Sequence, residues 1–437
     1  MVFDDGRSGT MARGTMAQAQ STSACTACLD PRAIEVTVED DPAELWKLRD
    51  EWNDLLRRSE TSTAFQALEW ILPWWEAFGS GARSLVLLAR VGGVLVGAAP
   101  LMISTRQLFG RKRRLVEFIA VRASDYADFI VGPDKEVILP ALLKQLLVCG
   151  SAWDLLYLSN MPEESSTLRQ VAVFFARHGY PLVERFDYEC PTYRFGDLEA
   201  DRRLVRKKSL KRHFNHFQKT GCLEFRRCRT ADDLLTFLDP FFEQHIARRA
   251  LTDVPSIFHD PRHRAFHRRA ALALLPTGWL DFSVVLHDGR PIAFHYGFDY
   301  NDKLMWYKPS FDPTLASRSP GEVLLKYLFE DALERELREF DFGIGDEPFK
   351  YRFANHTRRT AAVQVYRAAP AYYLDRTLLD LRARLKQSPS LMRLILRPGR
   401  QFSRRISGSH LEGRLEMPDH KSGLARLIKQ IIQRLDR

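Results

Sequence analysis

Cysteine is scarce in this chain. Only six of its 437 residues are cysteines, too few for a disulfide framework in a protein of this size. Cys25 and Cys28 form the one closely spaced pair, and neither a second Cys-x-x-Cys motif nor a neighbouring histidine pair completes a zinc site. We therefore expect free thiols, no metal and a reducing, cytoplasmic compartment.

We also expect no secretory signal and no membrane-spanning segment. Residues 1–32 have no apolar core and are rich in small polar residues, so we expect a disordered tail there. The stretch that most resembles a membrane span, residues 84–104, contains Gly92, Gly93 and Pro100. These breakers favour a β-hairpin over a spanning helix.

The excess of charge of one sign is moderate. Lysine and arginine number 65 and aspartate and glutamate 55, which gives a net charge of +10. This balance favours anionic partners in general, and we expect no DNA binding. Hydrophobic residues make up 45% and charged residues 27%, as in an ordinary globular protein. At roughly 100–200 residues per domain, the length allows two or three domains.

Two stretches of the chain show the same order of predicted elements: two amphipathic helices, a meander of strands, a helix and a further strand. Gly92–Gly93 marks a hairpin in the first stretch and Asp288–Gly289 marks one in the second. A helix between the last strands implies a parallel pair within an otherwise antiparallel sheet. The sequence therefore predicts an α/β (α+β) fold with two similar lobes, residues 33–195 and 200–370, each a mixed, mostly antiparallel sheet flanked by helices.

Residues 371–437 are rich in arginine, and we interpret them as a basic helical extension. Its last part, residues 424–435, has an apolar stripe at helical spacing. We expect this helix to pack on the body of the protein. The alternative is peripheral contact with a membrane surface or a partner.

Residues 317–322 (SRSPGE) stand between a predicted strand and a predicted helix. Ser319 suits the N-cap, Pro320 the first helical position, and Glu322 completes a capping box. Gly321 leaves the first turn without a side chain, and such a helix start presents free N–H groups to a phosphate or pyrophosphate. A purely structural, well-capped helix explains the pattern equally well.

Residues 340–345 (FDFGIG) predict a buried strand that ends in two glycines, where a ligand or another backbone can approach closely. Asp341 inside this strand needs a hydrogen-bond or ion-pair partner, and we expect a satisfied structural carboxylate. Lys350 and Tyr351 lie a few residues after this glycine-ended strand, which makes both of them candidates for a functional site.

With the preceding GRPIAFHYGFDYNDKLMWY, the stretches SPGEVLLKYLFEDA and FDFGIGDEPFKYRF resemble the GNAT-fold acyltransferases of the bacterial cellulose-biosynthesis (CelD-like) type. The resemblance covers about residues 36–370, with its specific motifs in the second half. That family is similar in design to the Fem-type peptidyltransferases, which have a Phe-Lys step resembling Phe349–Lys350. The resemblance implies transfer of an acyl group from acetyl-CoA or another acyl-CoA to an amine or hydroxyl.

The resemblance also implies a cofactor site in the second lobe, in which the pyrophosphate lies at a helix start and the thioester beside a splayed strand. Val323 departs from the general pattern, because it stands where a small residue is usual. The residues that this comparison selects for the cofactor are Arg318, Ser319, Pro320, Gly321, Trp306 and Tyr307.

Acyl transfer needs a polarised carbonyl, a base for the acceptor and an acid for the thiolate. Backbone N–H groups near residues 306–308 are our candidates for polarising the thioester carbonyl. Tyr351 is our candidate acid, with Lys350 as an electrostatic alternative. His295 is our candidate base, with Asp346 or Glu347 behind it.

Eight basic residues and no acidic one lie within residues 202–219, which we interpret as a helix with one apolar side. They form either a solvated face or a patch for an anionic acceptor, the CoA 3′-phosphate or tRNA. His263 and His267 have a spacing that zinc sites use, but no HExxH is present.

Three hypotheses remain open at this point. The first is an acyl-CoA-dependent transferase that acts on a polysaccharide, a lipid precursor or a small amine. The second is a Fem-type enzyme that uses aminoacyl-tRNA. The third is a non-catalytic GNAT-like binding module of exopolysaccharide assembly.

Overall fold

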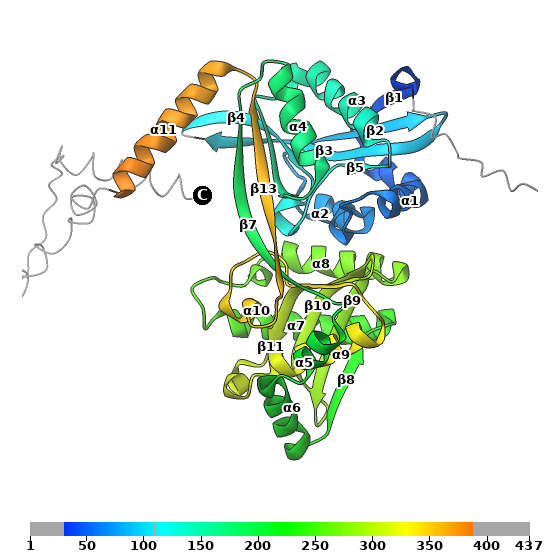
Figure 1. Cartoon of the computed structure of the whole chain (residues 1–437), viewed down its shortest axis with the longest axis vertical. Coiled ribbons are helices and arrows are strands. Elements are labelled where there is room, and N and C mark those ends of the chain that lie inside the picture. Colours follow the sequence, from blue (N-terminus) through cyan, green and yellow to red (C-terminus); the bar gives the residue numbers. More distant parts are fainter. Residues whose placement is uncertain (1–29, 109, 388–437) are drawn as a thin grey trace, which may run out of the picture.

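The computed structural model describes residues 30–108 and 110–387 (Figure 1). The Cys25–Cys28 pair, nearly all of the tail predicted for residues 1–32 and the helix predicted for residues 424–435 lie outside the described residues. A large mixed sheet with helices on both faces confirms the predicted fold class. The strands follow each other across the sheet in the order β1-β2-β3-β4-β6-β13-β7-β12-β11-β10-β9-β8, and β5 pairs with β3.

The first half of the chain contains one of the two predicted series of elements. Its strands and helices are β1 (Ile34–Glu39), α1 (Arg49–Arg58), α2 (Leu68–Phe78), β2 (Arg83–Val91), β3 (Val94–Leu108), β4 (Arg111–Phe118), β5 (Ile130–Val131), α3 (Lys135–Val148), β6 (Leu155–Pro162), α4 (Ser166–Arg177) and β7 (Leu182–Arg194).

The second half repeats this series. Its elements are α5 (Leu198–Val205), α6 (Lys208–Thr220), β8 (Leu223–Arg227), α7 (Ala231–Arg249), α8 (Pro261–Leu274), β9 (Leu280–His287), β10 (Arg290–Tyr300), β11 (Lys303–Phe311), α9 (Pro320–Glu334), β12 (Glu339–Asp341), α10 (Pro348–Tyr351), β13 (His356–Tyr366) and α11 (Ala369–Gln387).

Both predicted hairpins are confirmed. Gly92 and Gly93 have φ of 55° and 83°, and Asp288 and Gly289 have φ of 50° and 76°. Two successive residues with positive φ are typical of the turn that matches the twist of paired strands. The hairpin β2–β3 contains residues 84–104, the apolar stretch that most resembles a membrane span in the sequence. Within the described part of the chain, no helix is long and apolar enough to cross a membrane.

The predicted parallel pairs are also confirmed. Leu115 of β4 lies opposite Leu155 of β6, and Met305 of β11 lies opposite Asp341 of β12. In each case a helix, α3 or α9, connects the two strands over one face of the sheet. All other strand pairs of the described sheet are antiparallel.

Three large apolar cores hold most of the helices against the sheet, and a small fourth one lies beneath the start of α11. One face is covered by α1, α2, α7 and α8, which form a single core that joins the two halves of the molecule. On the other face, α3 and α4 cover the first half, and α5, α6 and α9 cover the second. Trp70 of α2 packs edge-on against Phe266 of α8, with ring centroids 4.6 Å apart, at the contact between the halves.

The end of the chain returns to the first half of the sheet. Strand β13 lies between β6 and β7, and the end of β7 pairs with β12 of the second half (Figure 1). The side chain of Asn355 bonds both backbone groups of Arg194, at 2.8 Å and 2.9 Å. The chain therefore leaves the first half and re-enters it at one point.

Two local predictions were wrong. The basic stretch 202–219 belongs to two helices, because α5 ends at Val205 and α6 begins at Lys208. The strand predicted through Gly345 ends at Asp341, because the following segment leaves β11.

Candidate active site

The most informative feature of the second half is the point where β11 and β12 separate. Their pairing ends at Met305 and Asp341, and β11 bulges at Trp306–Tyr307 opposite Gly297. A Cβ atom at Gly297 would lie 2.1 Å from the carbonyl oxygen of Met305, so only glycine fits there. The bulge turns the backbone of residues 306–308 toward a gap in the sheet.

His295 holds this bulge. Its Nδ1 lies 2.9 Å from a carboxylate oxygen of Asp281, and its Nε2 lies 3.1 Å from the carbonyl oxygen of Met305. Both ring nitrogens are engaged with acceptor atoms, and the fully buried ring lines neither of the cavities described below. Its carboxylate partner is Asp281 rather than Asp346 or Glu347, and the geometry gives it a positioning role.

Trp306 and Tyr307, which were selected for the cofactor, point to opposite faces of β11. Trp306 stacks on His295 on the side of α9. Tyr307 lies on the other side and donates its hydroxyl hydrogen to the carbonyl of Ala123, 2.6 Å away. Tyr307 thereby joins β11 to a loop of the first half.

The first turn of α9 lies against the end of β11. Ser319 is the N-cap and Pro320 the first helical residue, as predicted, but the capping box is absent. Ser319 has left-handed backbone geometry and its side chain makes no capping bond. The carboxylate of Glu322 instead accepts a hydrogen bond from Arg352 at 2.8 Å. The first N–H groups of α9 are thus not capped by a side chain.

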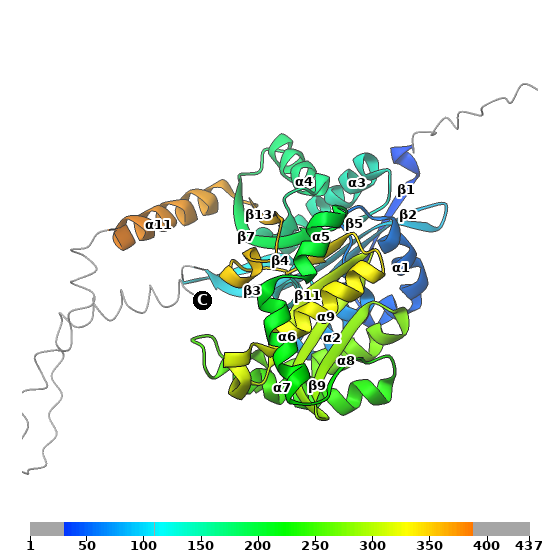
Figure 2. The same cartoon turned by 60° about the horizontal axis from the view of Figure 1, so that its bottom comes forward.

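Arg318 and the basic helix α6 lie beside this helix start. Arg318 is exposed, and its backbone is hydrogen-bonded to His213 of α6. Figure 2 shows α5 and α6 alongside α9. A Cβ atom at Gly321 would meet only Phe311, at 3.5 Å, so the space above the first turn is open. Uncapped N–H groups next to basic side chains suit a phosphate or pyrophosphate group.

Lys350 is buried beneath the loop that follows β12. Its Nζ donates to the carbonyl of Ile344 at 2.7 Å and pairs with Glu347 at 2.8 Å, so it holds the loop in place. Tyr351 is 40% exposed and lines neither of the cavities described below. Its hydroxyl hydrogen-bonds to Glu189, which raises the pKa of Tyr351 to about 12.

A cavity of about 380 Å³ lies between the two halves and reaches the separated end of β11. Its lining comes from β3, β4, β6, β7 and β11, from α8, and from the loops beside these elements. The lining residues are Arg106, Glu117, Val121, Arg122, Ala123, Ser124, Asp125, Tyr157, Ser159, Asn160, Asp187, Tyr188, Ile257, His263, Tyr307, Lys308 and Ile344.

Lys308 stands in this lining directly after the bulge. Its Nζ lies 4.0 Å from the centroid of the Tyr307 ring and makes no hydrogen bond or ion pair within residues 30–108 and 110–387. Burial lowers the pKa of Lys308, although the nearby Asp125 acts in the opposite direction. The carboxylate of Asp125 accepts a hydrogen bond from the backbone N–H of Ile344 at 3.0 Å, and burial raises its pKa.

His263 of α8 lines the same cavity. Its Nδ1 is buried and has no hydrogen-bond partner, and the half-buried side chain forms part of the cavity wall. Burial lowers the pKa of His263, Arg262 and Lys308 add to this effect, and Asp260 opposes it. The neutral imidazole can therefore accept a proton at neutral pH.

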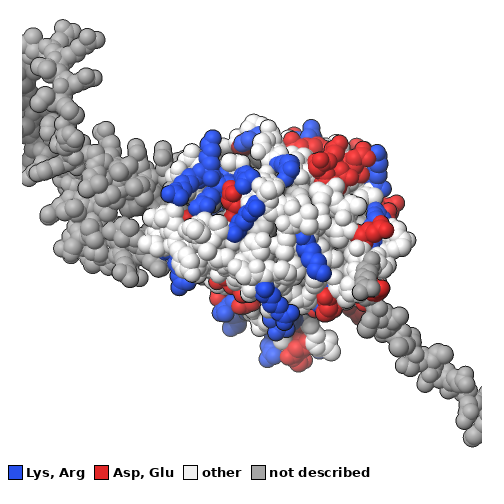
Figure 3. All heavy atoms as spheres, turned by 90° about the horizontal axis from the view of Figure 1, so that it is seen from above, with Lys and Arg blue, Asp and Glu red and all other residues white. Residues whose placement is uncertain are grey.

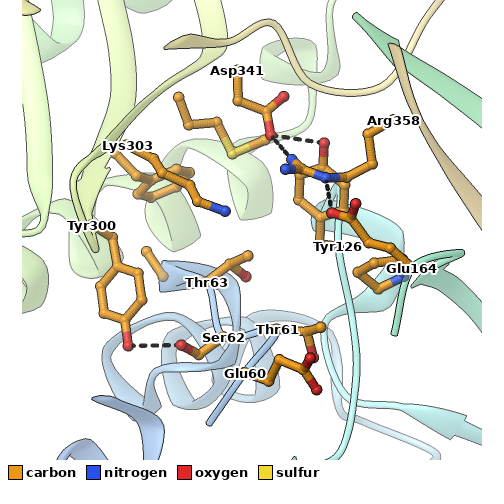
Figure 4. A pocket seen from close by; sticks show the side chains of 14 residues that line it. Glu60, Thr61, Ser62, Thr63, Tyr126, Glu164, Tyr300, Lys303, Asp341 and Arg358 are labelled. Carbon is orange, nitrogen blue, oxygen red and sulfur yellow. Dashed lines mark hydrogen bonds and ion pairs between the residues drawn. The ribbon is translucent and has the colours of Figure 1, made fainter. Parts of the chain in front are cut away.

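A second, smaller cavity of about 70 Å³ lies where β11 and β12 are still paired (Figure 4). In it, Asp341 accepts hydrogen bonds from Tyr126 at 2.8 Å and from Arg358 at 3.0 Å. Arg358 also bonds Glu164 at 2.6 Å. Burial raises the pKa of Asp341 to about 6 although Arg358 opposes this shift. The prediction that Asp341 has hydrogen-bond and ion-pair partners is confirmed.

The structure brings together residues that sequence reasoning missed. Lys308, Asp125 and His263 come from three separate elements, and only Lys308 carried a local signal. It is a cation in the interior of β11, a largely apolar strand, and a charge in such a strand needs a partner, as argued above for Asp341.

No group of three or more His, Cys, Asp or Glu side chains within residues 30–108 and 110–387 has the arrangement of a metal site. The rings of His263 and His267 have centroids 6.1 Å apart, and Nδ1 of His267 bonds the carbonyl of His263. The four cysteines in the described part of the chain, at positions 149, 190, 222 and 228, are all free thiols.

Residues 205–351 match the acetyltransferase (GNAT) domain family. This stretch contains the bulge of β11, the start of α9 and Lys350. The chain has no match among curated proteins.

Solved structures share the fold over most of their length. FemX has a TM-score of 0.55 at 10% identity, covering 78% of this chain and 99% of its own. The C-terminal domain of a proposed lysylphosphatidylglycerol synthetase from Agrobacterium fabrum has a TM-score of 0.50 at 13% identity, covering 78% and 97%. A conserved protein from Bacteroides thetaiotaomicron has a TM-score of 0.51 at 12% identity, covering 76% and 100%. At these identities the similarity shows the fold alone.

Proposed function

We propose that the protein is an acyltransferase that moves an acyl group, with acetyl as the first candidate, from a CoA thioester to an amine or hydroxyl. The observation that carries this proposal is the separation of β11 and β12 at a bulge, next to the uncapped start of α9. The gap offers backbone N–H groups to a thioester, and the helix start offers N–H groups to a pyrophosphate.

In the proposed reaction, the acceptor nitrogen or oxygen attacks the thioester carbon. Backbone N–H groups of residues 306–308 stabilise the negative charge on the carbonyl oxygen. The carbon–sulfur bond then breaks, and CoA leaves as a thiolate that takes up a proton. His263 accepts the proton that the acceptor loses, because the ring lines the cavity and its lowered pKa keeps it neutral at pH 7.

The resemblance to CelD-like acyltransferases also suggests where CoA binds and what the acceptor is. We infer that Arg318 and the first turn of α9 hold the phosphates of CoA, and that the acceptor is a polysaccharide, a lipid precursor or a small molecule of exopolysaccharide or envelope synthesis, as in the CelD-like type. The unpaired cysteines within residues 30–108 and 110–387 support a reducing, cytoplasmic compartment.

Thermal unfolding with and without acetyl-CoA, longer acyl-CoAs and CoA tests the donor. A ligand at a hundred times its dissociation constant stabilises the fold by roughly 2.7 kcal/mol, so wild type should shift clearly. Gly321→Glu places a carboxylate in the first turn, where it suits the helix dipole but repels a pyrophosphate. We expect this variant to fold and to lose the shift, while the matched Gly321→Ala keeps it. An equal shift in all three proteins would refute the assignment.

A second candidate function is a Fem-type transferase that uses aminoacyl-tRNA. All eight basic residues of α5, α6 and the segment between them are exposed. The first-half end of the molecule, seen in Figure 3, carries acidic and basic side chains together, so the α5–α6 surface is the better candidate for RNA. Binding of charged tRNA that falls steeply with salt, together with no response to any CoA species, would favour this function over the first.

A further inference from the structure

The larger cavity has two ends of different character. The end formed by the second half holds His263, Lys308 and Tyr307, next to the gap between β11 and β12. The end formed by the first half holds Arg106 and Arg122. A ligand that reaches across would place one group at the reacting end and another beside the two arginines.

The arginines at the first-half end keep free hydrogen-bond donors. Arg122 is exposed and has no hydrogen-bond or ion-pair partner in the described part of the chain. Arg106 pairs with Glu117 through Nη2, but its buried Nε has no partner. Burial lowers the pKa of Arg106; Glu117 opposes this shift, and the nearby Arg122 adds to it. Two neighbouring cations with unused donors favour an anion between them.

The acidic side chains at this end of the cavity, unlike the arginines, already have hydrogen-bond and ion-pair partners. Glu117 accepts hydrogen bonds from Arg106 and from Ser104, the latter at 2.6 Å. Asp187 pairs with Arg185 at 3.3 Å and accepts a bond from the backbone N–H of Asn160 at 3.2 Å. The unsatisfied polar groups at this end are therefore donors, which excludes a cationic ligand group there.

We propose that this cavity binds a small acceptor that carries a carboxylate or phosphate group held by Arg122 and Arg106, with its amine or hydroxyl directed toward His263. The proposal rests on the proposed acyl transfer for the role of the ligand, whereas the anion site itself rests on the arginines. A volume of about 380 Å³ lies within the usual range of small-molecule sites.

Calorimetric titration without any CoA species tests the anion site. The probes are O-phosphoethanolamine and β-alanine, which carry an amine with a phosphate or a carboxylate, and ethanolamine, which lacks the anion. We expect binding of at least one anionic probe and none of ethanolamine, and the two anionic arms distinguish phosphate from carboxylate. Arg122→Gln should weaken binding about tenfold or more, because a hydrogen bond to a charged group contributes about 1.5–3 kcal/mol.

Arg83→Gln is the matched control, because this substitution removes the same charge as Arg122→Gln. Arg83 is exposed in the first half and lines neither cavity. Arg122 has no partner to lose, so its replacement should leave the unfolding temperature unchanged. Binding that is equal in both variants, or absent for both anionic probes in wild type, overturns the proposal. Acyl-CoA binding without probe binding refutes this inference alone, whereas probe binding without any acyl-CoA binding refutes the proposed function alone.

Discussion

At the scale of single residues, the geometry of the gap depends on one glycine and one histidine. Gly297 leaves room for the carbonyl of Met305, and His295 donates to that same oxygen. Neither residue lines one of the two cavities, but together they fix the bulge that turns the β11 backbone. A change at either one therefore alters the site without removing a group that touches substrate.

Gly297→Ala should destabilise the protein and impair acyl-CoA binding. The new Cβ would lie 2.1 Å from the Met305 oxygen and 2.2 Å from Nε2 of His295, so the bulge has to shift. We expect a loss of roughly 1–3 kcal/mol in the free energy of unfolding, typical of overpacking. Gly321→Ala is the control, because its Cβ makes an ordinary contact. Equal stability of the two variants in urea unfolding would contradict the account of the bulge.

The pH dependence of turnover tests His263. Burial lowers the pKa of His263 from its ordinary value of 6.5. The neutral base is therefore present at pH 7 and becomes protonated only below pH 6.5. Wild-type kcat should fall on the acid side of pH 6.5, and His263→Gln should lose about 10²–10⁴-fold in kcat together with this acid limb. The exposed His259 is a matched control as His259→Gln. An acid limb that persists in His263→Gln would show that another group is the base.

At the scale of elements, local patterns predicted most of the secondary structure. Both turns with positive φ and both helix-linked parallel pairs were readable from sequence, because they depend on residues close together in the chain. The failed capping box shows the limit of such patterns. Arg352, thirty residues downstream, takes the carboxylate of Glu322 that a local rule assigns to the cap.

The helices α7 and α8 bury two histidines, which makes stability depend on pH. Burial lowers the pKa of His245 to about 3 and that of His267 well below its usual value. The unfolded chain therefore binds protons between pH 6.5 and 3 that the folded chain excludes, so the free energy of unfolding falls as pH falls through this window.

For His245 this loss amounts to roughly 2 kcal/mol at pH 5, since one pKa unit corresponds to about 1.36 kcal/mol. Thermal unfolding from pH 7 to 5 measures it. His245→Asn should flatten the dependence, and His259→Asn should leave it as in wild type. A slope unchanged by His245→Asn would contradict the buried neutral state.

At the scale of the whole molecule, the second half is inserted into a β-hairpin of the first. Strands β7 and β13 pair with each other, and Asn355 bonds Arg194 where the inserted segment begins and ends. The insertion of the second half between β7 and β13, and the cavity between the halves, were not predictable from one sequence. Both depend on which distant strands pair with each other, and the hydrophobic pattern of the sequence does not determine this pairing. The meeting of Asp125, His263 and Lys308 escaped prediction for the same reason.

Two shortened chains test this organisation. Residues 30–195 alone leave β6 and β7 without their shared neighbour β13, so we expect aggregation or no cooperative unfolding. Replacing residues 196–354 by a short glycine linker restores the β7–β13 hairpin, and this protein should unfold cooperatively. If residues 30–195 alone unfold as cooperatively as the linked protein, β13 is not an integral strand of the first half.

Hydrogen–deuterium exchange with and without acetyl-CoA tests the central claim most directly, because it locates the ligand. The account predicts slower exchange of amides in residues 306–311 and 318–323 of wild type, and no such change in Gly321→Glu. Both segments surround the gap beside α9. Unchanged exchange in these two segments at saturating acetyl-CoA would contradict the assignment of a thioester site to this part of the fold.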